Sequence, residues 1–383
     1  MSFKKIENLI SLTKGKKPLN IVQNSNGIYL PYVDIKVFET GIVDNYTDGE
    51  KCVSCNDGDL LIVCDGSRSG LVGKAVTGYV GSTLARIDVS DEIDINYLYY
   101  FIQGKYQVLN TNVKGTGTPH LKQDLLKSFD IYLPSLDEQQ RIVTKIEELF
   151  SKLDKGVEEL NKIKEQLKIY RQAVLKEAFE GIKSYKKISD LFDVTGGLTK
   201  NSKRNELSLR WKYLRVANVF FNYIDTTEIK SIGVKPEEIE KTLLKRNDLL
   251  FVEGNGSKDQ IGRVAIWNNE IENCLHQNHI IKARPMEQVL SKFALYYLMS
   301  TCGRKQITQI ASSTSGLYTL STNKIKNLSV PICDIKQQEK VICDIEERLS
   351  VCDKIEQTVN ESLQKAESLR QSILKQAFEG KLV

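Results

Sequence analysis

Two segments of this chain decide its fold: Arg171-Gln172-Ala173-Val174-Leu175-Lys176-Glu177-Ala178-Phe179-Glu180-Gly181 and Arg370-Gln371-Ser372-Ile373-Leu374-Lys375-Gln376-Ala377-Phe378-Glu379-Gly380. They align without a gap at a shift of 370 − 171 = 199 residues, and eight of the eleven positions are identical. They close two longer stretches, residues 137–181 and 336–380, which align at the same shift. A match of this kind at one fixed shift indicates an internal duplication.

Each of the two stretches is predicted to be one long helix. Neither contains proline, and each ends at glycine, which commonly terminates helices. The second stretch repeats the apolar spacing of the first from Val341 to Ile373, with Arg348 and Ser362 interrupting it. In the first stretch, steps of four and three residues mark a coiled-coil seam at Ile142, Ile146, Leu149, Leu153, Gly156, Leu160, Ile163, Leu167, Tyr170 and Val174.

An amphipathic helix cannot bury its own seam, so the two helices are predicted to pack together as a coiled coil. The chain must run out along the first helix and return along the second. The predicted pair is therefore antiparallel, with a globular segment ahead of each helix.

The globular segments, residues 1–134 and 182–331, resemble each other. Gly58-Asp59-Leu60-Leu61-Ile62-Val63 corresponds to Asn247-Asp248-Leu249-Leu250-Phe251-Val252, and Leu98-Tyr99-Tyr100 corresponds to Leu295-Tyr296-Tyr297. Both segments are predicted to contain short strands, among them strands near 71–80 and 211–219, and one helix each, near 94–109 and 288–303.

The predicted fold class is therefore α/β: two similar globular domains separated by two long antiparallel helices, with a pseudo-two-fold internal duplication. The predicted boundaries are 1–134 for the first domain, 135–181 for the first helix, 182–331 for the second domain and 332–383 for the second helix.

The positive charge of the chain is concentrated in one segment. Lys and Arg number 54 and Asp and Glu 49, a formal net charge of +5. Residues 1–134 carry 14 basic and 15 acidic residues, 14 − 15 = −1, whereas residues 182–331 carry 23 and 14, 23 − 14 = +9. A basic domain indicates a polyanionic partner, and nucleic acid fits best; scattered solubilising lysines are the alternative.

The sequence contains no apolar run long enough to cross a bilayer, and its first residues lack the apolar core of a signal peptide. We therefore expect a cytoplasmic protein that does not associate with membranes. Its eight cysteines are expected to be reduced thiols.

Sequence signals for catalysis are weak. The chain has no Gly-x4-Gly-Lys-Ser/Thr phosphate loop and no Asn/Asp-Pro-Pro-aromatic methyltransferase site. Cys52 and Cys55 lack a second pair at zinc spacing, and His276 and His279 fit DNA contact or packing better than metal binding. We expect neither a catalytic site nor a metal site in the chain.

Polar and basic loops instead offer contacts to DNA phosphates and base edges, although a solvated surface is the alternative for every residue. The candidates in the first domain are Lys16, Lys17, Arg68, Lys74, Asn112, Lys114, Thr116 and His120. The candidates in the second domain are Lys203, Arg204, Arg210, Arg215, Asn218, Asn255, Lys258, Arg263, Gln277, Asn278 and Ser313.

This arrangement resembles the specificity subunit of type I restriction-modification systems. Leu214-Arg215-Val216-Ala217-Asn218-Val219 is similar to an Arg-x-x-Asn segment of that family. Its strand-turn-strand run is matched by Asp248-Leu249-Leu250, Gly256-Ser257 and Ile261-Gly262-Arg263, and its helix entry by Leu133-Pro134 followed by Glu138-Gln139-Gln140-Arg141-Ile142-Val143. The first domain departs from the pattern, because Asp34 stands where Arg215 stands in the second domain and the loop reads Cys64-Asp65-Gly66-Ser67.

The resemblance implies two target-recognition domains that each read one half of a split, asymmetric site in double-stranded DNA, with helices that fix the gap between the half-sites. It also implies that two methyltransferase (modification) subunits dock on the helices, and that motor-nuclease (restriction) subunits complete the complex. S-adenosylmethionine, ATP and Mg²⁺ would bind those partners, and this chain would hold no cofactor and catalyse no reaction.

Two other classes of protein remain open. One is a stand-alone or fused DNA-acting enzyme with an unrecognised centre, which would cut or methylate DNA by itself. The other is a coiled-coil scaffold, which would bind proteins and no nucleic acid.

Overall fold

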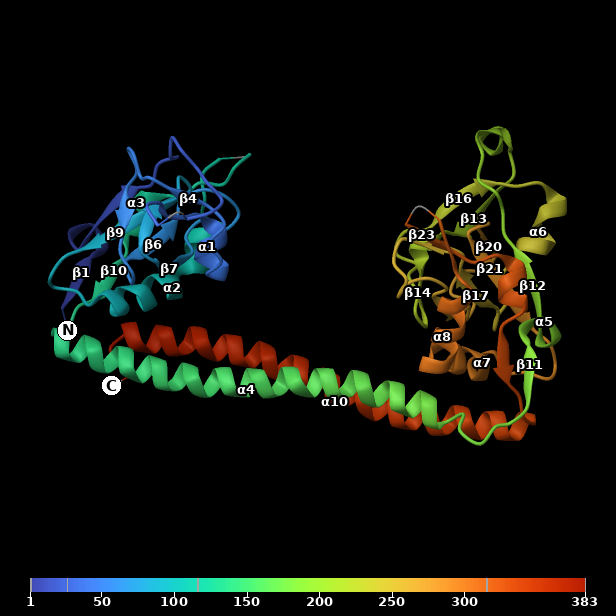
Figure 1. Ribbon diagram of the computed structural model, residues 1–383. Coiled ribbons are helices and arrows are strands. Elements are labelled where there is room, and N and C mark those ends of the chain that lie inside the picture. Colours follow the sequence, from blue (N-terminus) through green and yellow to red (C-terminus); the bar gives the residue numbers. More distant parts are fainter. Residues whose placement is uncertain (1, 26, 116, 315, 383) are drawn as a thin grey trace. The chain divides into compact units, whose positions relative to one another are not determined.

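The computed structural model describes residues 2–25, 27–115, 117–314 and 316–382. The chain divides into two compact units: unit 1 contains residues 1–161 and 360–383, and unit 2 contains residues 162–359. Each unit combines one globular domain, called here the first or the second domain, with a part of both long helices (Figure 1).

The first domain contains two four-stranded sheets. One has the order β2 (Ile10–Lys14), β9 (Leu84–Val89), β6 (Leu60–Val63), β7 (Val72–Lys74), with antiparallel neighbours. The other has the order β4 (Tyr46–Thr47), β3 (Leu30–Val33), β8 (Gly78–Val80), β5 (Ser54–Cys55), and its central pair, β3 and β8, is parallel. Leu60 and Ile62 of β6 belong to one hydrophobic cluster and Leu61 and Val63 to another. Apolar packing on both faces explains the uninterrupted apolar run of β6.

The second domain repeats this plan. One sheet has the order β12 (Phe192–Gly196), β21 (Ile280–Pro285), β17 (Leu249–Val252), β19 (Val264–Ile266), and another has the order β16 (Lys230–Gly233), β13 (Arg210–Leu214), β20 (Cys274–His276), with β13 and β20 parallel. Leu249 and Phe251 of β17 belong to one cluster and Leu250 and Val252 to another. The duplication predicted from the sequence therefore extends to strand order and direction.

Two further sheets belong to the second domain. The three-stranded sheet has the order β18 (Gly254–Asn255), β23 (Leu317–Thr319), β22 (Ser312–Thr314), and β14 (Val219–Phe220) pairs with β15 (Tyr223–Ile224) as a hairpin. In each domain a short strand pair joins the start of the domain to its end: β1 (Phe3–Lys5) with β10 (Asp130–Tyr132), and β11 (Tyr185–Lys187) with β24 (Ser329–Pro331).

Short helices fill the remainder of the domains. The first domain contains α1 (Ile35–Thr40), α2 (Ile95–Thr111) and α3 (Gln123–Ser128). The second contains α5 (Ile188–Leu191), α6 (Pro236–Thr242), α7 (Ser291–Met299), α8 (Thr301–Ile310) and α9 (Thr322–Lys326). None of the helices in the described part of the chain has an apolar stretch long enough to cross a bilayer.

Three predicted elements are wrong in detail. Residues 71–80 form two strands, β7 and β8, because the chain passes there from one sheet to the other. The strand predicted at 211–219 ends at Leu214, where the turn Val216–Asn218 follows. The helix predicted at 288–303 is divided into α7 and α8 at Ser300, whose side chain accepts a hydrogen bond from the Gly303 amide and so caps α8.

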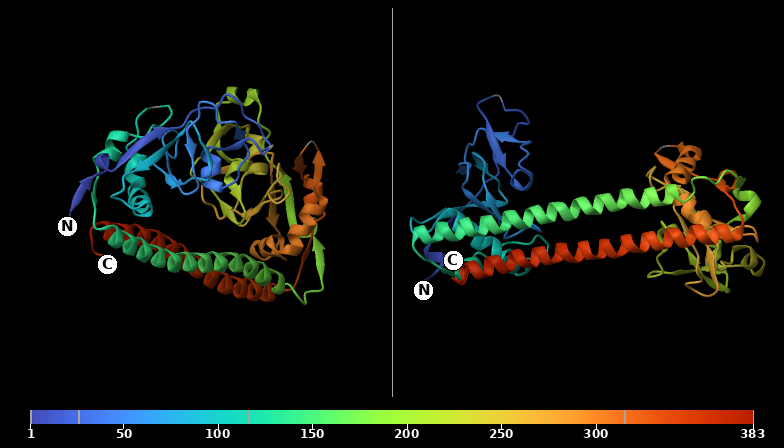
Figure 2. Two further views of the ribbon diagram at one scale, coloured as in Figure 1. Left: turned by 60° about the vertical axis from the view of Figure 1, so that its left-hand side comes forward. Right: turned by 90° about the horizontal axis from the view of Figure 1, so that it is seen from below.

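The two long helices are α4 (Leu136–Glu177) and α10 (Ile335–Phe378), and they pack together as predicted (Figure 2). In unit 1, Ile142 and Ile146 of α4 share a hydrophobic cluster with Ile373 and Leu374 of α10. The start of α4 thus packs with the end of α10, which is the antiparallel arrangement.

Unit 2 shows the reverse pairing, in which Val174 and Leu175, near the end of α4, share a cluster with Ile345, near the start of α10.

The predicted seam is not buried at every position: Tyr170 and Leu369, which correspond at the 199-residue shift, are 45% and 49% exposed.

A buried glutamine joins each long helix to its own domain. The Gln139 side chain accepts a hydrogen bond from the Asp94 amide and donates to the carbonyls of Glu92 and Pro134. Gln338, its counterpart at a shift of 199, makes the same three bonds, to the amide of Leu290 and the carbonyls of Gln288 and Cys333. These bonds fix the start of each helix against the loop that precedes α2 or α7.

Candidate DNA-binding surfaces

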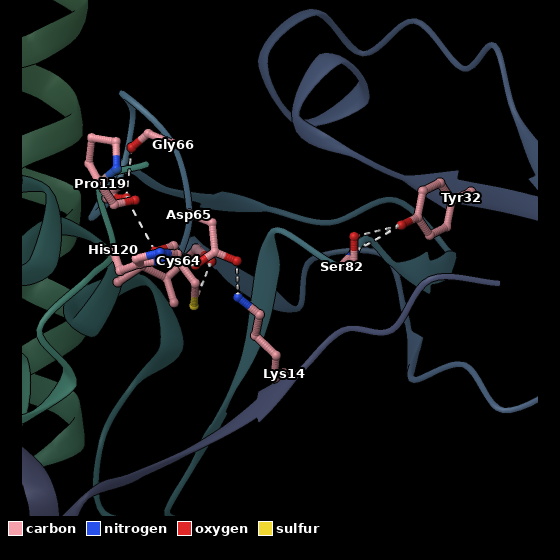
Figure 3. A network of polar contacts seen from close by, with 10 residues as sticks. Lys14, Tyr32, Cys64, Asp65, Gly66, Ser82, Pro119 and His120 are labelled. Atoms are coloured by element: carbon pink, nitrogen blue, oxygen red, sulfur yellow. Dashed lines mark hydrogen bonds and ion pairs between the residues drawn. The ribbon is translucent and has the colours of Figure 1, made fainter. Parts of the chain in front are cut away.

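A polar network lies at the end of β6 in the first domain (Figure 3). Asp65 accepts hydrogen bonds from Lys14, at the end of β2, and from Nδ1 of His120, at 2.7 Å. The turn that follows Asp65 is held to the same loop, because the Gly66 amide donates to the Pro119 carbonyl at 2.9 Å. Burial of the Asp65 carboxyl would raise its pKa, but the bonds from Lys14 and His120 outweigh burial and keep the pKa below its ordinary value.

Three predicted residues of the first domain lie at or beside this network. The backbones of Lys114 and His120 exchange two hydrogen bonds of 2.8 Å, so both residues belong to one loop. Arg68 lies in the adjoining turn, with its Nε 3.4 Å from Glu39. All three side chains are exposed, as a nucleic-acid contact requires.

The other predictions for the first domain fall elsewhere. Asn112 donates to the Val108 carbonyl at 2.9 Å and so completes the end of α2. Lys74 lies over the ring of Tyr99 in α2, with its Nζ 5.9 Å from the ring centroid. Lys16 and Lys17 are exposed on the segment after β2, and Thr116 lies outside the described residues.

Two predicted residues of the second domain are engaged inside the fold. The guanidinium of Arg204 forms two hydrogen bonds to Glu238, of 2.7 and 2.9 Å, and donates further to the carbonyls of Thr199 and Gly233. Those bonds lower the pKa of Glu238 to about 2. Asn218 is 3% exposed, and its amide accepts from the Arg215 backbone and donates to the carbonyls of Asp225 and Glu228. Both side chains organise loops and have little polarity left to offer DNA.

Two arginines of the second domain surround the turn at Val216. Arg215 donates to the Glu228 carbonyl at 3.1 Å, and Arg263 donates to the Val216 carbonyl at 3.4 Å. The Arg263 guanidinium also lies over the Phe220 ring, 5.3 Å from its centroid. Burial lowers the pKa of Arg263 below its ordinary value. Each Nε is buried without a hydrogen-bond partner in the described chain, so both cations are incompletely satisfied within the domain.

The sheet β18-β23-β22 brings two more predictions together. Asn255 and Ser313 lie on opposite sides of Tyr318, because both neighbouring strands pair with β23 at that residue. The nearby Lys258 is exposed. Polar residues at the edge of a small sheet can contact bases or phosphates.

The remaining predicted DNA-binding residues of the second domain do not form one cluster. The backbone amides of Gln277 and Asn278 donate to the carbonyls of Leu214 and Leu198. Arg210 donates to the Ser231 carbonyl at 3.1 Å, and the exposed Lys203 lies in the turn Ser202–Glu206.

The residue pairs considered as metal ligands have other surroundings. His276 is fully buried with Nδ1 2.9 Å from the Ile280 carbonyl, and burial lowers its pKa to about 3. His279 is exposed, with Nδ1 2.8 Å from Glu253. Burial raises the pKa of the Cys55 thiol to about 11. The described residues contain no group of three or more ligands that could hold a metal ion.

Sequence reasoning missed Lys14, Asp65 and Glu253 as members of these surfaces. Asp65 was visible as part of the unusual Cys64-Asp65-Gly66-Ser67 loop. The residues that join it come from segments far apart in the sequence, and nothing in their spacing indicates that they meet.

A second, duplicated surface lies where each domain meets the long helices. In unit 1, Arg370 forms an ion pair with Asp154 and lies over the Phe150 ring, 4.5 Å from its centroid. In unit 2, Arg171 forms an ion pair of 2.7 Å with Asp353. Both pairs border grooves with corresponding linings, Tyr100, Glu147, Phe150, Ser151, Asp154 and Arg370 in unit 1 and Tyr296, Glu346, Leu349, Ser350, Asp353 and Arg171 in unit 2.

Comparisons with known proteins identify the family. The family model described as type I restriction modification DNA specificity domain matches residues 1–168 and again residues 182–365. The type I restriction enzyme MjaVIII specificity subunit of Methanocaldococcus jannaschii is 26% identical over 365 residues, which cover 88% of this chain and 83% of that protein. The EcoKI specificity subunit of Escherichia coli K12 is 28% identical over 284 residues, 70% of this chain and 61% of that protein.

Solved structures share the fold. A chain from a study of complex assembly and conformational transition of the type I R-M system has a TM-score of 0.77 at 15% identity, covering 99% of this chain and 98% of that one. The HsdS subunit from Thermoanaerobacter tengcongensis has a TM-score of 0.59 at 16% identity, covering 99% and 97%. With a family model that matches both halves, the chain belongs to the type I restriction-modification specificity family and is the non-catalytic DNA specificity subunit of such a system, with two target-recognition domains.

Proposed function

We propose that the two domains read different halves of one split, asymmetric DNA site, residues 1–134 reading one half and residues 182–331 the other. The observation that carries this proposal is that one strand order supports two different sets of polar loops. The first domain has the network of Asp65 and His120, whereas the second has the β18-β23-β22 sheet with Asn255 and Ser313. Loops that differ in sequence present different hydrogen-bonding groups and therefore select different bases.

The second domain is proposed to contribute more of the phosphate binding. It carries the basic excess, and although Arg204, Lys282 and Arg284 are engaged inside the fold, Lys203 and Lys258 are exposed. Exposed cations that neutralise phosphates release counterions, which strengthens binding to any DNA sequence.

Two copies of the methyltransferase subunit are proposed to dock where the domains meet the helices. The supporting observation is the pair of corresponding grooves, one in each unit. The two closing stretches, 171–181 and 370–380, share three further polar residues: Gln172, Lys176 and Glu180 in one, and Gln371, Lys375 and Glu379 in the other.

The Lys–Glu pairs of these two sets span 4.0 and 3.9 Å, and such surface pairs add little stability. Folding alone therefore does not require these residues to be the same in both copies. A partner that binds at both places would require it. Motor-nuclease subunits would join this assembly, which would act in the cytoplasm, and S-adenosylmethionine, ATP and Mg²⁺ would bind the partner subunits.

The long helices are proposed to set the gap between the half-sites. α4 is one continuous helix of 42 residues, and it lies in the chain between β10, the last strand of the first domain, and β11, the first strand of the second. Helix length converts to distance at ~1.5 Å per residue, so the number of residues in the helices would determine the spacer that the complex accepts.

Methylation mapping tests these proposals. The chain is produced with its methyltransferase subunit in cells that lack other DNA methylation, and the genome is sequenced for modified bases. We expect one two-part motif with unlike halves and a fixed spacer. Modification of DNA by the purified chain alone would favour an enzyme, and absence of DNA binding by the assembled complex would favour a scaffold.

A further inference from the structure

Two exposed histidines are held in the same way, one in each domain. Nδ1 of His120 lies 2.7 Å from an Asp65 carboxylate oxygen, and Nδ1 of His279 lies 2.8 Å from Glu253. The chain contains three histidines, and the third, His276, is buried. Both exposed histidines pair with a carboxylate close to the end of a central strand: Glu253 is the first residue after β17, and Asp65 is the second residue after β6.

Duplication of the domain does not explain this likeness. The Cys64 amide donates to the Thr83 carbonyl and its carbonyl accepts from the Leu121 amide. In the second domain the Glu253 amide donates to the His279 carbonyl and its carbonyl accepts from the Leu320 amide. His279 therefore occupies the backbone position of Thr83, and His120, which precedes Leu121, occupies that of Thr319. Two different loops supply the same arrangement.

The arrangement leaves one ring nitrogen of each histidine available. The imidazole side chains are 54% and 55% exposed, while their carboxylate partners are 26% and 31% exposed. Within the described part of the chain, Nε2 of neither ring has a hydrogen-bond partner. The carboxylate accepts from Nδ1 and fixes the plane of the ring, so Nε2 is the atom presented to a ligand.

The surroundings of both rings are those proposed to meet DNA. His120 shares a loop with Lys114, and the carboxylate that holds it also binds Lys14. Glu253, which holds His279, is followed directly by β18, whose residue Asn255 lies near Ser313. A hydrogen bond made by a side chain as exposed as these imidazoles contributes little to stability, so folding alone does not account for either pair.

We propose that His120 and His279 are matched DNA-contacting residues of the two target-recognition domains, and that Asp65 and Glu253 are the positioning residues that orient their rings. Nε2 forms a hydrogen bond with a polar group of the DNA: in the neutral ring it accepts from a donor on a base edge, and in the doubly protonated ring it donates to a phosphate oxygen or to an acceptor on a base edge. This inference rests on the proposed function, because it assigns each histidine to the half-site that its own domain reads.

The test uses the complete chain assembled with its methyltransferase subunit and a duplex that carries the methylated site. His120→Ala and His279→Ala are each expected to weaken binding about tenfold and to slow methylation. Glu253→Gln retains an acceptor for Nδ1 and should keep most of the affinity, whereas Glu253→Ala releases the ring and should behave like His279→Ala. Thermal unfolding confirms that each variant is folded.

Two series of measurements distinguish the DNA groups. Duplexes with single base changes show whether the loss is confined to one base pair, as a base contact requires. Affinities measured over a range of salt concentrations show whether the loss is the same for all sequences. They also show whether the slope of log affinity against log salt is lower by about 1, as a phosphate contact requires. If the histidines contact bases, His120→Ala must relax base specificity in one half-site and His279→Ala must relax it in the other.

Unchanged binding and methylation by folded histidine variants would overturn the inference, and so would specificity changes from both variants in the same half-site. Failure of the unaltered complex to methylate any defined sequence would instead refute the proposed function, so the two failures are distinguishable.

Discussion

The two domains differ at the ends of their central strands and match where they meet the helices. β6 leads into Asp65, where Lys14 and His120 converge, whereas β17 leads into Glu253 and the β18-β23-β22 sheet. At the helices, Gln139 and Gln338 make the same three bonds. The comparison indicates which surface serves which function. The surfaces at the helices, which match in the two units, suit a partner that binds twice, and the ends of β6 and β17, which differ, suit two unlike half-sites.

The largest effect is expected from lengthening the helices while both domains stay unchanged. One heptad is inserted into α4 between Lys155 and Leu160 and a matching heptad into α10 near Ile355. Seven residues preserve the seam and add roughly 10 Å at ~1.5 Å per residue, which corresponds to about three base pairs at ~3.4 Å each. The lengthened complex should methylate the same two half-sites with a longer spacer and lose the original site, as methylation sequencing will show.

Insertion of the heptad into one helix alone is the control, because the antiparallel partner cannot follow and all activity should fall. If the doubly lengthened protein methylates only the original spacing, the helices are not the ruler and serve only to dock partners.

A second comparison concerns two polar residues that follow corresponding strands. Asn218→Ala removes three hydrogen bonds from a buried amide and should destabilise unit 2 by about 1–3 kcal/mol. Asp34→Ala removes the cap of α1, where Asp34 accepts from the amides of Lys36 and Val37, and should cost only about 1 kcal/mol. Denaturant unfolding of the full chain measures both losses, and a larger loss for Asp34→Ala would contradict the burial argument.

A third comparison is the response to acid. Burial lowers the pKa of His276 to about 3, whereas an unfolded histidine titrates near ~6.5. Between these values the unfolded chain binds a proton that the folded chain does not. The stability of unit 2 should therefore decrease as the pH is lowered below 6.5, by about 1.4 kcal/mol per pH unit. The corresponding strand position of the first domain holds Val80, which cannot titrate. Unfolding midpoints between pH 7 and 5 test this.

His276→Asn is the matched variant, because its amide can still donate to the Ile280 carbonyl but does not titrate. Its stability should change less with pH over the same range. An equal loss in variant and parent would show that other groups cause the acid sensitivity.

The sequence predicts the parts of this molecule that depend on periodicity and repetition. The 199-residue shift locates both long helices, and the apolar runs locate β6 and β17. The sites were harder, because they depend on side chains that meet through loops. Asn218 stands in a family-like segment, yet its amide is buried, and the partners of Asp65 lie 51 and 55 residues away. Polarity identifies candidate residues, but only tertiary packing decides which of them face outward.

The smallest expected effect separates total charge from local charge. Lys203→Gln with Lys258→Gln removes two exposed cations of the basic second domain, and Lys16→Gln with Lys17→Gln removes two from the first. Each lost phosphate contact should weaken binding to all sequences and lower the slope of log affinity against log salt by about 1. Because the second domain carries the whole basic excess, its pair should lower the slope more. Anisotropy titrations of the assembled complex over a range of salt concentrations measure both slopes. Equal decreases would show that charge within each loop, and not the total charge of a domain, determines where the phosphates are held.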